Sequence, residues 1–206
     1  MVLRLFHKGL HLFGRKTQPV IIVSGLPRSG TSMMMKMLEA GGLEVLTDYV
    51  RQPNEDNPKG YYEFERVKKL PEGDTAWLKA AEGKVVKVIS ALLLHLPSDH
   101  TYKILFMRRS LEEILASQKQ MLVRRGEPTD KVDDAEMARL FQKHLQEVQS
   151  WLDRQSNITY LDVDYNVMLR DPRPQVMQIL TFLGDTLDFE KMMDVVDPAL
   201  YRQKKE

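Results

Sequence analysis

Residues 20–32 read Val-Ile-Ile-Val-Ser-Gly-Leu-Pro-Arg-Ser-Gly-Thr-Ser, and this stretch decides the fold class. Its first five residues form a short, mostly β-branched apolar run, which is typical of a strand buried in a parallel sheet. A turn bounded by Gly25 and Gly30 follows, and residues that favour a helix come directly after it. The stretch therefore predicts a strand, a tight loop and a helix in immediate succession.

Comparable apolar runs recur along the chain, at residues 43–46, 85–89, 102–107 and 158–163. The segments between them are long enough for the crossovers that parallel strands require. Alternation of strands and helices is the pattern of a sheet covered on both faces. The sequence therefore predicts an α/β fold of three layers, α/β/α, with a mostly parallel central sheet similar to that of P-loop NTPases.

Three later helices are predicted, at residues 110–124, 133–155 and 174–183. Ser110 and Glu113 have the spacing of a capping box, so we expect their side chains to close the start of the first of these helices. Gly184 follows the last one in the position of a C-cap. The long helix carries an apolar stripe that we expect to face the core, formed by Met137, Leu140, Phe141, Leu145, Val148 and Leu152.

A chain of 206 residues suffices for one well-buried domain, which we place at residues 20–206. Residues 1–19 are predicted to form an amphipathic extension, because Leu3, Phe6, Leu10 and Phe13 recur at helical spacing. Basic residues and histidines interrupt this run, so we expect the extension to dock on its own domain or on a partner rather than on a membrane.

The balance of charges excludes several classes of partner. Thirty basic residues oppose 29 acidic ones, and the net charge of +1 provides no broad field for binding nucleic acid. Apolar residues make up 43% of the chain, an ordinary share that predicts no integral membrane segment. Any anion site must therefore be local.

The chain has no cysteine, which excludes disulfides, thiolate metal sites and thiol nucleophiles and is typical of a reducing cytoplasm. His7 and His11 have the spacing of metal ligands, but no carboxylate or cysteine accompanies them. We therefore predict a cytoplasmic protein without a metal site.

The glycine-bounded loop at residues 25–30 predicts an anion site. Backbone N–H groups and the start of a helix converge there on any bound anion. The spacing of the glycines matches the nucleotide P-loop, but Thr31 stands where that motif has its phosphate-bridging lysine. Arg28 can supply the positive charge that the missing lysine would have given, if the bound anion is a phosphosulfate. Unlike a nucleoside triphosphate, a phosphosulfate needs no bound metal in this role.

The segment Arg28-Ser29-Gly30-Thr31-Ser32 resembles the 5′-phosphosulfate loop of sulfotransferases that use 3′-phosphoadenosine-5′-phosphosulfate (PAPS). Arg109 and, eight residues on, Ser117 match the pattern that binds the 3′-phosphate in that family. Tyr165 begins a third matching region, which continues to Gly184 and implies a place for Tyr165 near the adenine. A half-buried aromatic residue after a strand is the other interpretation of Tyr165.

The resemblance implies a sulfotransferase that releases adenosine 3′,5′-bisphosphate, but the catalytic Lys-x-His of relatives reads Lys87-Val88-Ile89 here. Lys87 matches the lysine that bridges the donor, or is a charge at a strand end. The missing histidine implies a carboxylate base. Glu63, which follows a turn at Pro58 and Gly60, is the first candidate, although a carboxylate at the start of a helix also favours the helix dipole.

Asp48, after the second strand, is the next candidate for the base. His95 is only the third candidate, because its leucine-rich neighbours are typical of a histidine packed in the core rather than of a base in an active site. An NTP-dependent small-molecule kinase and a non-catalytic nucleotide-binding domain stay open as alternative functions. The acceptor also stays open: a carbohydrate, a lipid, a small alcohol or a peptide tyrosine would each suit the donor half, with a hydroxyl or an amine as the reacting group.

Overall fold

The computed structural model describes residues 18–48, 50, 60–129, 133–184 and 186–197. Most of the predicted N-terminal extension lies outside the described residues, as do His7, His11 and Pro58.

The central sheet has five strands in the order β2-β3-β1-β4-β5, and all of them are parallel. The strands are β1 (Val20–Gly25), β2 (Val45–Leu46), β3 (Val85–Lys87), β4 (Tyr102–Arg108) and β5 (Ile158–Asp164). Both β2 and β3 are shorter than their apolar runs, but every predicted strand is present. The predicted α/β class with a parallel central sheet is confirmed.

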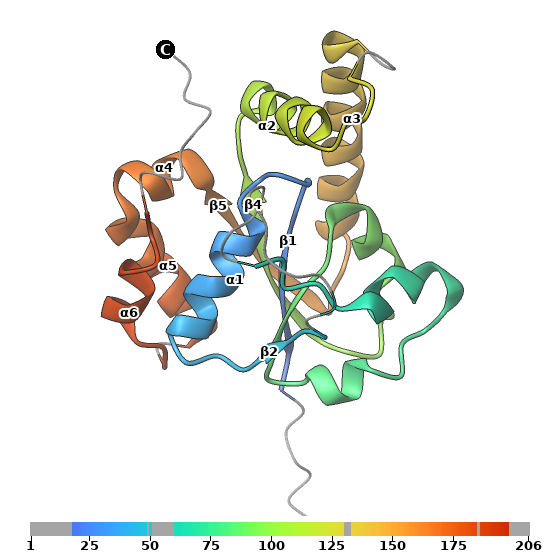
Figure 1. The fold of residues 1–206 in the computed structure, drawn as a ribbon. Coiled ribbons are helices and arrows are strands. Elements are labelled where there is room, and N and C mark those ends of the chain that lie inside the picture. The colour runs from blue at the N-terminus through green and yellow to red at the C-terminus, as the bar shows by residue number, and fades with distance from the viewer. Residues whose placement is uncertain (1–17, 49, 51–59, 130–132, 185, 198–206) are drawn as a thin grey trace, which may run out of the picture.

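Helices cover both faces of the sheet (Figure 1). One face carries α1 (Thr31–Ala40), α4 (Tyr165–Arg170), α5 (Pro172–Leu183) and α6 (Phe189–Met193). The other face carries α3 (Asp134–Leu152) and three 3-10 helices: η1 (Glu65–Glu72), η2 (Leu78–Ala81) and η3 (Ser90–His95). The remaining helix, α2 (Leu111–Arg124), follows β4 and packs against α3.

Alternating side chains of β1 divide the core into two clusters. Ile21 and Val23 face the cluster that includes α1, whereas Val20 and Ile22 face the cluster that includes α3. All six residues of β1 are buried, as expected for a central parallel strand. The methionines of α1 belong to the first cluster, where Met34, Met35 and Met37 are fully buried.

The order of the strands places a switch point at the carboxyl end of β1. The chain leaves β1 toward β2 at one edge, and β4 later pairs with β1 on its opposite side. In open parallel sheets, ligands bind outside the carboxyl ends of the strands at such a point. The loop after β1 and the residues that follow β3 and β4 therefore share one end of the sheet.

Two predicted details of the helices are wrong. Ser110 is the N-cap residue of α2, but its side chain makes no capping hydrogen bond, and Glu113 pairs with Arg109 instead. Leu140 is 48% exposed although it belongs to the predicted apolar stripe of α3, of which Val148 and Leu152 are buried. The predicted C-cap is confirmed, because Gly184 follows α5 with a φ of 112°.

No helix in the described ranges is both long enough and apolar enough to pass through a bilayer.

The burial of α1 predicts a large effect of truncation at Leu38. This side chain is fully buried in the cluster beside β1. Leu38→Ala should therefore lower the free energy of unfolding by about 2–5 kcal/mol, because it leaves a cavity. Urea denaturation measures this loss. Met177 is 52% exposed on α5, so Met177→Ala should change the same free energy by less than about 0.5 kcal/mol.

Candidate functional site

The loop between β1 and α1 depends on two glycines. Gly25 has a φ of 146°, and a Cβ atom there would lie 2.8 Å from the carbonyl oxygen of Met107. Gly30 has a φ of 99° and precedes α1 as its N-cap. Neither position has room for a side chain, and glycine allows the backbone to make a tight turn there. The turn leads directly into α1, a helix of ten residues. Thr31 and Ser32 are the first two residues of that helix.

Arg28 lies inside this loop and reaches across to α2. Its Nε donates a hydrogen bond to Ser117 Oγ over 3.0 Å, joining residues 89 positions apart. Arg28 itself has a φ of 70°, in the left-handed region that residues with a side chain rarely adopt. The surrounding contacts hold this conformation, as is common at functional sites.

Arg109 connects the loop to the end of β4 and to α4. Its Nη1 donates to the carbonyl oxygen of Arg28 over 3.0 Å, and its Nε donates to Glu113 Oε2 over 2.9 Å. Both side chains of that ion pair are almost completely buried, with 7% and 6% exposed. The other oxygen of Glu113 accepts from Asn166 Nδ2 over 2.8 Å. Arg109 is thus held on several sides beside Arg28.

Tyr165, the first residue of α4, packs against both Arg109 and the loop. Its ring lies under the guanidinium of Arg109, with 4.6 Å between the ring centre and Cζ. The same ring occupies the place where a Cβ atom of Gly30 would stand, 2.3 Å from the ring. Burial is the main cause that raises the pKa of the Tyr165 hydroxyl, and the nearby Arg109 opposes that rise. Tyr165 is therefore protonated and packs against the loop.

Two hydroxyls at the base of the loop are suited to meet an anion. Ser24 and Ser29 are almost fully buried, and neither Oγ atom has a hydrogen-bond partner among the described residues. A buried hydroxyl without a partner is costly, and a bound ligand can satisfy it. Together with the exclusion of side chains at Gly25 and Gly30, these hydroxyls make the loop fit a phosphate or a sulfate group.

Lys87, the last residue of β3, reaches the same loop. Its Nζ lies 3.5 Å from Ser32 Oγ and also donates to the carbonyl oxygen of Tyr61. The structure therefore places a second cation at the start of α1, on the side of the loop opposite to β4. The predicted residues of the loop, Arg109, Ser117, Tyr165 and Lys87 come together at one end of the sheet.

The segment before η1 carries Glu63 and is fastened by its backbone. Thr47 Oγ1 donates to the carbonyl oxygen of Glu63 over 2.8 Å, and the N–H of Asp48 reaches the same oxygen over 3.2 Å. The carboxylate of Glu63 lies 3.7 Å from Lys68, whereas Glu65 lies only 2.6 Å from that ammonium group. The hydrogen bond that Lys68 donates to Glu65 is also the main cause that raises the pKa of Lys68. Lys68 is therefore mainly the partner of Glu65.

The carboxylate of Asp48, the second candidate for the base, is engaged by two backbone N–H groups. Its carboxylate accepts from the N–H of Glu65 over 2.6 Å and from the N–H of Val50 over 3.1 Å. Asp48 thereby satisfies, from outside the helix, the N–H group of the first residue of η1. Of the two candidate carboxylates, Asp48 organises the segment that carries Glu63.

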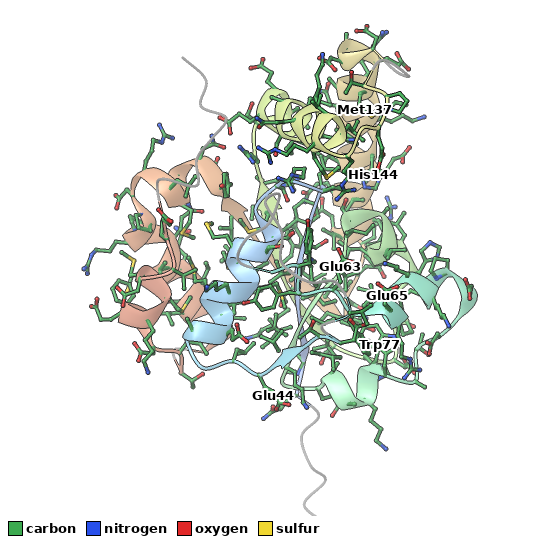
Figure 2. The ribbon with its side chains drawn as sticks, viewed as in Figure 1. Glu44, Glu63, Glu65, Trp77, Met137 and His144 are labelled. Carbon is green, nitrogen blue, oxygen red and sulfur yellow. The ribbon has the colours of Figure 1, made fainter. Side chains whose placement is uncertain are left out.

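The histidines are arranged differently from the expectation. His95 ends η3 and is exposed, although its leucine-rich neighbours predicted a packed side chain. His144 was not predicted to have a role, yet its Nε2 lies 2.9 Å from the Oγ of the buried Ser90. Its signal in the sequence is weak: His144 stands four positions before Val148 on the predicted apolar stripe. Figure 2 shows His144 on α3, next to η3, and Glu63 below it.

In the described part of the chain, no group of three or more His, Cys, Asp or Glu residues has a geometry that could hold a metal ion.

The chain is similar to known proteins in its domain family and in its fold. The family model described as "Sulfotransferase domain" matches residues 18–206. No curated protein matches the sequence. Sulfotransferase STF1 from Mycobacterium tuberculosis H37Rv has a similar fold, with 18% identity and a TM-score of 0.54 over 86% of this chain and 71% of that one. The sulfotransferase domain from the curacin biosynthetic pathway has 16% identity and a TM-score of 0.52, over 87% of this chain and 78% of that domain.

At these identities the two solved structures support the fold alone, whereas the match to the family model spans all of the described residues. The chain therefore belongs to the sulfotransferase domain family.

Proposed function

We propose that the protein transfers a sulfuryl group from PAPS to a hydroxyl or amine of a small-molecule or carbohydrate acceptor. The convergence of Arg28, Arg109 and Ser117 on the loop before α1 carries this proposal. A donor with a phosphosulfate at one end and a 3′-phosphate at the other needs two anion sites close together. Membership of the family supports the same chemistry.

The loop and Lys87 would hold the 5′-phosphosulfate. The N–H groups at the start of α1 and the hydroxyls of Ser29 and Ser32 are suited to an anion, and Lys87 adds a positive charge beside Ser32. Arg28, which lies inside the loop, would contribute a second positive charge. Charge-assisted hydrogen bonds of this kind stabilise the negative charge that grows on a leaving phosphate.

Arg109 and Ser117 would hold the 3′-phosphate, and Tyr165 would lie beside the adenosine. Glu113 and Asn166 position Arg109. The hydrogen bond from Asn166 fixes the carboxylate of Glu113, and the buried ion pair with that carboxylate fixes the guanidinium of Arg109. Arg109 is therefore ready for a bidentate contact without having to be ordered first. Residues that are already positioned cost less ordering when the donor binds.

Glu63 would act as the general base. Its neighbour Asp48 is engaged by two backbone N–H groups, so Asp48 is better suited to positioning than to proton transfer. When bound, the donor supplies a sulfuryl group bonded to a good leaving phosphate. Glu63 takes the proton of the acceptor as the new bond to sulfur forms and the bond between sulfur and the phosphate oxygen breaks. Lys87 then neutralises the leaving oxygen.

The donor site predicts selectivity among nucleotides. Adenosine 3′,5′-bisphosphate should raise the melting temperature far more than AMP, or than ATP with Mg²⁺, because ligands that bind only the folded state stabilise it. Ser117→Ala should weaken the binding of the bisphosphate about tenfold or more, since it removes a hydrogen bond to a charged group. Isothermal titration calorimetry measures the Kd.

Ser110→Ala is the matched control, because Ser110 is the N-cap residue of the same helix, α2, and its side chain makes no capping hydrogen bond. Its Kd should match that of the unmodified protein. Arg109→Ala is a less suitable variant, since it leaves the buried Glu113 without its ion-pair partner and should also lower the melting temperature. Equal thermal shifts with all three nucleotides would contradict a 3′-phosphate site and favour the kinase alternative.

If Glu63 is the general base, its replacement should affect turnover but not binding of the nucleotide. Glu63→Gln keeps the shape of the side chain but removes its basicity, so kcat should fall by about 10²–10⁴-fold while the Kd for adenosine 3′,5′-bisphosphate stays unchanged. Steady-state kinetics with PAPS and a reactive alcohol such as 2-naphthol measure kcat.

Glu65→Gln is the control, because Glu65 lies two residues away and shares Lys68 as a partner. Its kcat should change by less than about threefold. Asp48→Ala should lower the melting temperature, because the N–H group at the start of η1 loses its acceptor at a cost of about 0.5–2 kcal/mol. If Asp48→Asn loses turnover while Glu63→Gln keeps it, the base has been assigned to the wrong carboxylate.

A further inference from the structure

Two residues other than glycine have a left-handed backbone in the described part of the chain, and both belong to the candidate site. Arg28, in the loop, has a φ of 70°, and Tyr62, directly before Glu63, has a φ of 52°. This conformation is unfavourable for a residue with a Cβ atom, so it persists only where surrounding contacts impose it. Arg28 is held by Ser117 and Arg109. Tyr62 must likewise be held by contacts of its own.

The side chain of Tyr62 fastens this residue to α1. Its hydroxyl donates a hydrogen bond to Glu39 Oε2 over 2.6 Å, and the side chain packs, partly buried, against the hydrophobic cluster that includes α1. The peptide before Tyr62 is held as well, because the carbonyl oxygen of the buried Tyr61 accepts a hydrogen bond from Lys87 Nζ. Both the side chain of Tyr62 and the backbone that leads into it are therefore fixed.

The left-handed residue changes the direction in which the chain presents its side chains. In an extended segment, residues two positions apart point to the same side. Tyr62 packs against the cluster on the α1 face of the sheet, whereas Phe64 packs against the cluster on the α3 face, with its ring centre 5.6 Å from that of Trp77. The chain therefore crosses from one face of the sheet to the other between these residues, and Glu63 stands at the crossing.

This crossing lies at the end of the sheet that carries the loop. The carbonyl oxygen of Glu63 accepts a hydrogen bond from the N–H of Asp48, which follows β2. Strand β3 separates β2 from β1, so the ends of β2 and β1 lie about 10 Å apart at the usual spacing of strands. Lys87, at the end of β3, contacts both Ser32 and the carbonyl oxygen of Tyr61. One lysine thus connects the loop to the segment that carries Glu63.

We propose that Tyr62 is a positioning residue: its left-handed backbone, held by Glu39 and by packing against α1, sets the direction from which Glu63 reaches the acceptor. This inference rests on the proposed role of Glu63 as the general base and deepens it. A base has to lie within hydrogen-bond reach of the proton that it removes, and a misplacement of about 1 Å can lower the rate about 100-fold. Tyr62 acts through Glu63 and not by contact with either substrate.

Two variants separate the backbone of Tyr62 from its side chain. Tyr62→Val and Tyr62→Asn both remove the ring and the hydroxyl, but asparagine tolerates a left-handed backbone, whereas the β-branched valine does not. With PAPS and 2-naphthol, Tyr62→Val should lower kcat about tenfold or more, and Tyr62→Asn should keep a kcat at least about threefold above that of Tyr62→Val.

Binding of the nucleotide is the control for both variants. The Kd for adenosine 3′,5′-bisphosphate should stay within about twofold of that of the unmodified protein, because the loop is unchanged and only the chemical step is affected. Isothermal titration calorimetry measures this Kd and also gives the fraction of protein that binds. A variant that folds poorly can therefore be corrected for its folded fraction before its kcat is compared.

A double substitution shows whether Tyr62 acts through Glu63. If it does, adding Tyr62→Val to Glu63→Gln should change kcat by less than about twofold, because the effects of residues that act as a unit do not add. A merely structural role of Tyr62 would lower kcat by the same factor with Glu63 and with Glu63→Gln.

Two outcomes would overturn the positioning role alone: Tyr62→Val and Tyr62→Asn giving the same kcat, or Tyr62→Val lowering kcat equally with and without Glu63→Gln. Failure of the proposed function looks different. If Glu63→Gln by itself keeps full turnover, the base is another residue and the role of Tyr62 falls with it. If the unmodified protein transfers nothing from PAPS, the sulfuryl transfer itself is overturned, together with the inference that rests on it.

Discussion

The contact between Gly30 and the ring of Tyr165 determines how the two ends of the site meet. Because the ring stands where a Cβ atom would be, α4 approaches the loop more closely than any other residue at position 30 would allow. Tyr165 supports Arg109 from the same position, and Arg109 holds the carbonyl oxygen of Arg28. The loop, the end of β4 and the start of α4 are thereby locked into one unit.

The buried pair of Arg109 and Glu113 belongs to this unit and constrains it. Two charges almost removed from water are tolerated only when they are paired and their remaining hydrogen-bonding atoms are satisfied. The side chain of Asn166 donates a hydrogen bond to the second carboxylate oxygen of Glu113. The carbonyl oxygen of Arg28 accepts a hydrogen bond from Nη1 of Arg109. The orientation of the guanidinium is therefore set before any ligand arrives.

Local signals in the sequence were sufficient for the sheet and the loop. The apolar run of β1 and the glycines after it lie within short windows, where periodicity and turn chemistry act directly. The spacing from Arg109 to Ser117 was interpreted through its resemblance to a family pattern. Contacts between distant segments were not readable in this way. The bond from Arg28 to Ser117 spans 89 positions, and Glu113 fits a capping box in sequence but pairs with Arg109 in space. The same limit hid the bond from His144 to Ser90 and the exposure of Leu140.

The sheet keeps the two hydrophobic clusters apart. The cluster with α1 and α4 supports the loop and Tyr165, whereas the cluster with α3 and the 3-10 helices supports Ser90 and the surface around it. A change of side-chain volume on one face has to be absorbed there, because five strands of hydrogen-bonded backbone lie between the clusters. The face with α3 can thus change its shape while the face that carries α1 and Tyr165 keeps its own.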